Sequence, residues 1–123
     1  MRELFDHKSG LTNDPSDRIR VFACDARGPG NANHEYKADL DNGTPLSGFI
    51  KFQFGPLQEN TFNGVSNESV LAIVIDRLKG FQAGPFACRE NAIALTHLQD
   101  AMHWLHARTR ERAFRGVEGK TAA

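Results

Sequence analysis

The stretch from Gly84 to Gly119 constrains this chain most, because it is typical of one long helix. Gly84-Pro85 is a turn dipeptide that blocks helix upstream, and proline suits the first position of a helix, where its missing N–H costs nothing. We therefore expect the helix to begin near Phe86. Gly116 and Gly119 provide the stop signals at its C-terminal end.

Small and apolar residues recur along this predicted helix at steps of three and four, and they form one stripe. The stripe consists of Asn91, Ala94, Leu98, Ala101 and Leu105, continued by Arg108 and Arg112. Alternating small and large residues would let another helix approach closely. Asn91 and Arg112 are 21 residues apart, about 30 Å along an α-helix. An antiparallel second copy would place these two ends side by side and create two equivalent polar pockets. The alternative is a solvated arginine end, with the stripe packed only on the preceding helix.

The residues before this helix predict a small sheet and a second helix. Alternating apolar and polar residues favour strands over residues 18–24, 34–40 and 49–54, and Asp41-Asn42-Gly43 is a hairpin turn signal. Ser66 or Asn67 is expected to cap a helix over residues 67–81, and the short connection that follows predicts an antiparallel helical hairpin.

The predicted fold class is α+β, in one domain that spans residues 1–123. A small antiparallel sheet (residues 18–56) is followed by a C-terminal antiparallel helical hairpin (residues 66–115), which oligomerises through its long helix. Residues 1–17 are expected to form a flexible arm or loop, and residues 116–123 a tail.

The charge balance argues against a protein that binds duplex nucleic acid or a membrane with its whole surface. Fifteen Lys and Arg residues balance fifteen Asp and Glu residues, so the formal net charge is zero. Five of the basic residues lie between His106 and Lys120, where they could attract a small anion. Cys24 and Cys88 have no metal or redox spacing, which indicates a cytoplasmic protein with reduced thiols. No cofactor is expected.

Metal and catalytic sites are poorly supported by the sequence. His97, His103 and His106 lie on the long helix without a further ligand on the same face. A nucleophilic cysteine or a carboxylate pair of Asp25 and Glu35 lacks any catalytic signature. We therefore expect neither a metal nor an enzyme.

A compact anion such as a pyrophosphate suits the arginine end better. Arg108 and Arg112 are one helical turn apart and could form a forked clamp. Phe81, just before the turn, offers a flat face for a purine, and the Asn91 amide could read an edge or a hydroxyl. The alternative for Phe81 is a plain core residue, and the alternative for the arginines is contact with nucleic-acid phosphates.

Several motifs resemble the phage Thoeris anti-defence sponge family, which is related to the anti-CBASS cyclic-nucleotide sponges. They are FQxGPFxCRENxxAL, then WLxxRTxxRxxRGVEG, preceded by NANHEY and FQFGPLQENTFNGV. The resemblance covers residues 22–119. It implies a protein without catalytic activity that captures cyclic ADP-ribose isomers made by a TIR-domain immune enzyme, chiefly the glycocyclic form.

The resemblance also implies roles for individual residues. Phe81 would stack on the base, Asn91 would make the polar contact, and Arg108 and Arg112 would clamp the phosphates. Family members are dimers that assemble further, commonly to hexamers, in the cytoplasm of the infected bacterium. Some also bind cyclic di- or trinucleotides of CBASS immunity, which is the alternative function here. The residues considered for such a second site are Arg27, His34, Tyr36 and Arg115.

Overall fold

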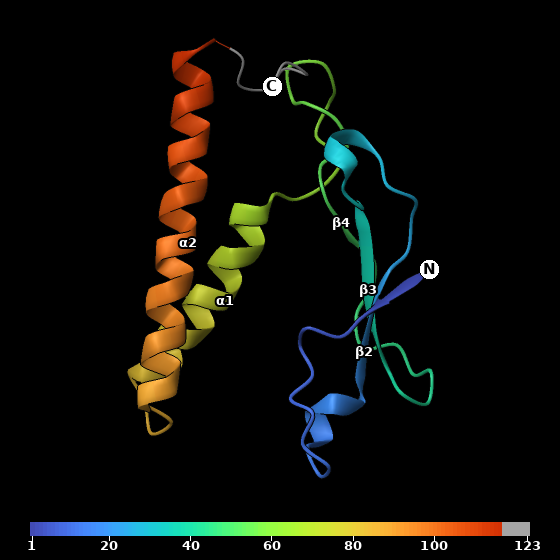
Figure 1. Cartoon of the computed structure of the whole chain (residues 1–123), viewed down its shortest axis with the longest axis vertical. Helices are drawn as coiled ribbons and strands as arrows, with labels where there is room; N and C mark the ends of the chain where they lie inside the picture. Colours follow the sequence, from blue (N-terminus) through green and yellow to red (C-terminus); the bar gives the residue numbers. More distant parts are fainter. Residues whose placement is uncertain (117–123) are drawn as a thin grey trace. The chain divides into compact units, whose positions relative to one another are not determined.

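The computed structural model describes residues 1–116 and confirms the predicted α+β class. The strands occupy the N-terminal half of the chain and the two helices the C-terminal half (Figure 1). The chain divides into two compact units. The sheet unit contains residues 1–55 and 60–64, and the helical unit contains residues 56–59 and those from 65 onward.

The sheet unit contains four antiparallel strands in the order β1-β2-β3-β4, each paired with its neighbour in sequence. Their bounds are β1 Arg2–Leu4, β2 Ile19–Ala23, β3 Glu35–Leu40 and β4 Ile50–Lys51. The predictions for residues 18–24 and 34–40 are confirmed by β2 and β3, which pair from Ile19 opposite Leu40 to Ala23 opposite Tyr36. Short 3-10 helices span Pro15–Arg18 and Pro29–Asn31.

One face of this sheet is charged. Arg20 and Phe22 alternate with apolar residues along β2, and Lys37 lies opposite Phe22 on β3. The Arg20 guanidinium donates two hydrogen bonds to the Glu3 carboxylate of β1, at 3.0 and 2.8 Å. Arg20 and Lys37 both lie over the Phe22 ring, at 5.0 and 5.6 Å from its centroid. The face is therefore a half-buried layer of paired charges around one aromatic ring.

Two predictions for the sheet unit need correction. Residues 2–4, expected in a loose arm, form β1, a strand of three residues that is too short to show a periodic pattern. The strand expected over residues 49–54 is limited to Ile50–Lys51. The Asn63 side chain explains the early end, because it accepts the N–H of Phe54 at 2.7 Å and donates to the carbonyl of Phe54 at 3.0 Å. A side chain nine residues away thus occupies the N–H and carbonyl groups of Phe54, which an adjacent strand would otherwise bond.

The first helix of the helical unit, α1, spans Asn67–Gln82 and confirms the helix expected over residues 67–81. Ser66 is its N-cap, as expected. The Ser66 hydroxyl accepts the N–H of Ser69 at 3.1 Å, and the Ser66 N–H donates to the Ser69 hydroxyl at 2.9 Å. This reciprocal capping box satisfies donors that the first turn would otherwise leave unpaired.

The long helix, α2, spans Arg89–Phe114, so the expected start near Phe86 is wrong. Its N-cap is Cys88, whose sulfur accepts the N–H of Asn91 at 3.4 Å. Because cysteine is not one of the usual capping residues, the sequence did not mark Cys88 as the cap, and Pro85 suggested a start three residues too early. The predicted stop at Gly116 is confirmed by its φ of 73°, while Gly119 lies outside the described residues.

The stripe of α2 that packs on α1 differs from the stripe predicted to meet a second copy of the chain. The half-buried residues along it are Asn91, Leu95, Leu98, Met102 and Leu105. Leu95 and Met102 belong to this stripe, whereas Ala94 and Ala101 of the predicted stripe are exposed together with Arg108. Both choices satisfy helical spacing, but the larger side chains fill the space against α1 better.

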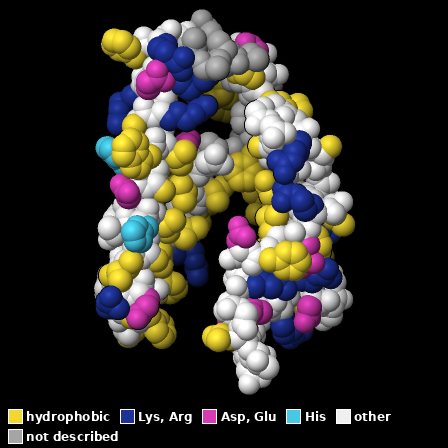
Figure 2. Space-filling view, in the orientation of Figure 1, with side chains coloured by type: hydrophobic (Ala, Val, Ile, Leu, Met, Phe, Trp, Pro, Cys, Tyr) yellow, Lys and Arg dark blue, Asp and Glu magenta, His cyan; other side chains and the backbone are white. Residues whose placement is uncertain are grey.

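The hairpin buries little apolar surface within one chain. Ile75 of α1, 9% exposed, is the most buried apolar side chain of the helical unit among the described residues. Hydrophobic side chains remain visible along the hairpin in Figure 2, and Ile73 and Trp104 are 62% and 65% exposed. Apolar exposure of this extent is typical of a surface that another chain covers. Within residues 1–116, no helix has the length and apolarity needed to cross a bilayer.

Candidate functional site at the two ends of the hairpin

The tip of the helical hairpin brings together two of the four predicted ligand residues. Phe81 lies in the last turn of α1 and Asn91 in the first turn of α2, on either side of the connection formed by residues 83–88 (Figure 1). Both positions lie near the tip because the helices are joined by a short turn. The sequence order alone, with nine residues between the two positions, does not require this placement.

The Phe81 ring is not part of a buried core in the helical unit, since it is 36% exposed. The ring of Phe86 meets it edge to face, with centroids 6.3 Å apart and planes at 87°. The guanidinium carbon of Arg77, one turn earlier on α1, lies 5.4 Å from its centroid. The Phe81 ring is therefore a partly exposed aromatic surface flanked by an arginine and a second ring.

Asn91 is half-buried at the start of α2. Its backbone N–H is occupied by the Cys88 cap, which orients the first helical turn. The unsatisfied N–H groups at a helix start carry partial positive charge, so this position favours a ligand with electronegative atoms.

The other two predicted ligand residues lie near the opposite end of the hairpin. Arg108 and Arg112 are 17 and 21 residues beyond Asn91 on the continuous helix α2. These separations correspond to about 25 and 31 Å at the α-helical rise. Arg108 is exposed and Arg112 is half-buried. One chain therefore separates the aromatic and amide groups from the arginine clamp.

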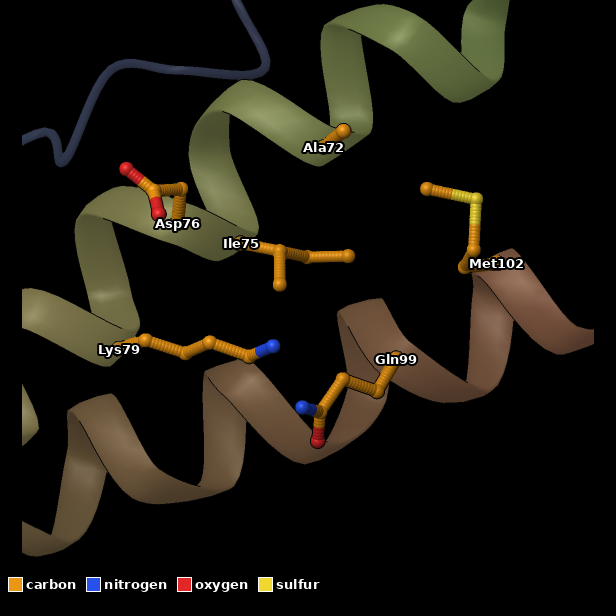
Figure 3. Close-up of a pocket in the computed structure, with 6 residues that line it drawn as sticks. All are labelled: Ala72, Ile75, Asp76, Lys79, Gln99 and Met102. Atoms are coloured by element: carbon orange, nitrogen blue, oxygen red, sulfur yellow. The ribbon is translucent and has the colours of Figure 1, made fainter.

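A shallow groove of about 380 Å³ lies between the two helices (Figure 3), and none of the four predicted residues lines it. Ile75 and Met102 point toward each other along it, and Lys79 and Gln99 supply polar atoms near one end. It is also lined by Ala72 and Asp76. None of these residues was expected at a site, although Ala72, Ile75 and Lys79 recur at the helical spacing that marks one face.

The residues considered for a second ligand site have structural contacts of their own. Arg27 donates to the carbonyl of Asn31 at 2.9 Å, and the ring of Tyr36 meets Phe52 edge to face at 5.6 Å. Arg115 pairs with Glu111 on α2. Arg115 belongs to the helical unit and the other three residues to the sheet unit, so the four residues do not lie in one compact unit.

His34 of this set is buried, with 8% of its surface exposed. Its backbone N–H donates to the Asp25 carboxylate at 3.0 Å, and its ring meets Phe54 at 5.0 Å. Among the residues that the structure describes, its Nδ1 atom has no hydrogen-bond partner. Burial of this kind is typical of a side chain that packs within the fold.

Asp25 likewise stabilises a loop. Burial raises the pKa of its carboxyl, but hydrogen bonds from the N–H groups of His34 and Glu35 lower that pKa by a larger amount. The pKa of Asp25 therefore lies below its ordinary value. Glu35 in turn pairs with Lys51 at 3.8 Å. An ionised carboxylate that accepts two backbone donors is poorly suited to abstract a proton. Across residues 1–116, no three His, Cys, Asp or Glu side chains are grouped in a way that would hold a metal ion.

Comparison with known proteins agrees with the hairpin geometry. Residues 45–110 match the family described as "Acb2/Tad1, hairpin domain", a range that contains β4, α1 and most of α2. The chain is also similar to Thoeris anti-defense 1 of Bacillus phage SBSphiJ7, with 54% identity over 70 residues. That alignment covers 57% of this chain and 49% of the relative, so the chain matches about half of the relative's length. The resemblance to the Thoeris anti-defence family is confirmed, and the chain belongs to the Acb2/Tad1 hairpin-domain family.

Proposed function

We propose that this protein is a phage anti-defence protein that captures a cyclic ADP-ribose isomer, chiefly the glycocyclic form, and holds it unaltered. Its family membership and its similarity to a protein named Thoeris anti-defense 1 support the anti-defence role. The immune signal is released by a TIR-domain enzyme in the cytoplasm of the infected bacterium, where the protein would act.

The observation that carries the proposal is the separation of the two half-sites along α2. Phe81 and Asn91 lie at the tip of the hairpin, and Arg108 and Arg112 lie about 25 and 31 Å further along. An antiparallel second copy brings the tip of one chain beside the arginines of the other. Two-fold symmetry then produces two equivalent complete pockets.

The chemistry of each half-site fits one part of the ligand. The Phe81 ring, already supported by Phe86, stacks on the adenine base. The Asn91 amide both donates and accepts, which suits a base edge or a ribose hydroxyl. Arg108 and Arg112, one turn apart, clamp the pyrophosphate with charge-assisted hydrogen bonds.

The surface of α2 supports the required association. Ala94 and Ala101 are exposed on the same side of α2 as Arg108, so a second helix can approach closely beside the clamp. Ile93 and Trp104 of the same helix are 42% and 65% exposed and would be buried by a partner. We therefore propose a homo-oligomer, either a dimer or a hexamer built from dimers.

Inhibition follows from mass action without catalysis. A sponge present at micromolar concentration with a nanomolar dissociation constant leaves almost no free signal. The corresponding difference in binding free energy is about 4 kcal/mol.

The test is a capture and release experiment. The purified protein is incubated with glycocyclic ADP-ribose, filtered, and heated, and the released material is analysed. We expect the ligand to leave the filtrate and to be recovered intact. A cleaved product would indicate an enzyme. Ligand left in the filtrate would refute this choice of signal and would shift the proposal to cyclic di- and trinucleotides, which are tested in parallel.

A further inference from the structure

The connection at the hairpin tip is closed by a side chain for which the sequence predicted no role. Gln82 is the last residue of α1 and is half-buried. Its Oε1 atom accepts the backbone N–H of Cys88 at 3.1 Å. One hydrogen bond therefore spans the whole connection between the helices.

The bond from Gln82 ends at the residue that starts α2. Cys88 is the N-cap, and its sulfur accepts the N–H of Asn91 at 3.4 Å. Two consecutive hydrogen bonds thus connect the end of α1 to the cap of α2, and that cap to Asn91. Because Gln82 directly follows Phe81, these bonds also restrict the position of Phe81 relative to Asn91.

Other contacts make this arrangement rigid. The Phe81 and Phe86 rings pack edge to face across the connection. The N–H of Ala83 donates to the carbonyls of Lys79 and Gly80, and the N–H of Gly84 donates to that of Phe81. The main chain next to Gln82 is therefore fixed, and the glutamine side chain adds the link that reaches the second helix.

We infer that Gln82 is a positioning residue for ligand capture, which holds Phe81 and Asn91 at the spacing that the ligand needs. This inference rests on the proposed function. Gln82 acts through the Cys88 N–H and does not contact the ligand itself. Preorganisation of this kind improves affinity because the ordering of the site is completed before the ligand arrives.

Two substitutions separate the hydrogen bond from the shape of the side chain. Gln82→Met keeps a similar length but has no strong acceptor, whereas Gln82→Glu keeps an acceptor oxygen and supplies negative charge next to the start of α2. We expect Gln82→Met to weaken the affinity for glycocyclic ADP-ribose about tenfold, equivalent to about 1.4 kcal/mol. We expect Gln82→Glu to stay within about twofold of the unmodified protein.

The readouts are the dissociation constant by calorimetry, the oligomeric state by size-exclusion chromatography, and hydrogen exchange of the Cys88 amide in the ligand-free full chain. The inference predicts that Gln82→Met exchanges faster at Cys88, remains folded and oligomeric, and binds more weakly. A methionine variant that exchanges faster but binds within twofold would overturn it, because the bond would then be structural only. Equal weakening in both variants would also overturn it. Failure of the unmodified protein to bind in the same series would instead refute the proposed function.

Discussion

Complementation between two defective chains tests whether each pocket is shared by two copies. Asn91→Ala removes the amide at the hairpin tip, and Arg112→Ala removes half of the clamp at the other end of α2. Each variant by itself should lose ligand capture while it keeps the oligomeric state. A dimer with one chain of each kind should regain it, because one of its two pockets combines an unmodified tip with an unmodified arginine end.

The expected size of the effect follows from the geometry. Asn91 and Arg112 are about 31 Å apart along one helix, so a pocket within one chain would leave both variants defective in any mixture. Truncation of a desolvated charged contact costs about 2–5 kcal/mol, which weakens the dissociation constant by at least about thirtyfold. If the two variants mix at random, about half of the dimers contain one chain of each kind, and each mixed dimer has one intact pocket out of two. About a quarter of all pockets in the mixture should then bind the ligand. In purified mixed dimers, about half of the pockets should bind it.

The assay uses co-expression of the two variants with different affinity tags and purification through both tags. Calorimetry then gives the number of ligands bound per chain. Arg110→Ala, which removes an exposed arginine from the same helix, is the matched control and should bind normally in all combinations. Mixed dimers that bind no better than the two parent variants would show that the pocket is not shared. Normal binding by either single variant would refute the residue assignment.

Three further predictions concern stability. Ile75→Ala should lower the free energy of unfolding by about 2–4 kcal/mol, because it leaves a cavity at the most buried apolar position of α1; a change below about 1 kcal/mol in chemical denaturation would mean that the hairpin packs differently. Ser66→Ala should cost about 1 kcal/mol through loss of the capping box, whereas Ser66→Asp should retain most of the stability in the same melts. The hydrogen bonds from Arg20 hold the pKa of Glu3 below its ordinary value of 4.5. The pair therefore stabilises the sheet above that pH, and the contribution is lost as pH falls through the lower folded-state pKa. Glu3→Gln should flatten the acid side of the stability curve, and an unchanged acid limb would contradict this account.

The sequence determined the features that depend on neighbouring residues. Alternation over a few positions indicated β2 and β3, and a serine cap with helical periodicity indicated α1. Gly116 marked the end of α2 because its left-handed backbone conformation suits glycine. The four ligand residues were also proposed from spacing, residue chemistry and family resemblance, and their roles stay predictions.

Only the tertiary structure decided the features that depend on contacts between residues far apart in the sequence or on an unusual capping residue. β4 ends early because Asn63 bonds to the backbone of Phe54, and no local pattern records that contact. α2 begins at Arg89 because a cysteine caps it. The stripe that faces α1 uses Leu95 and Met102 since their volume fills the space between the helices, while periodicity permitted either stripe. The tip at which Gln82, Cys88 and Asn91 are linked exists only once the hairpin closes, because its bonds join side chains of one helix to the backbone that begins the next.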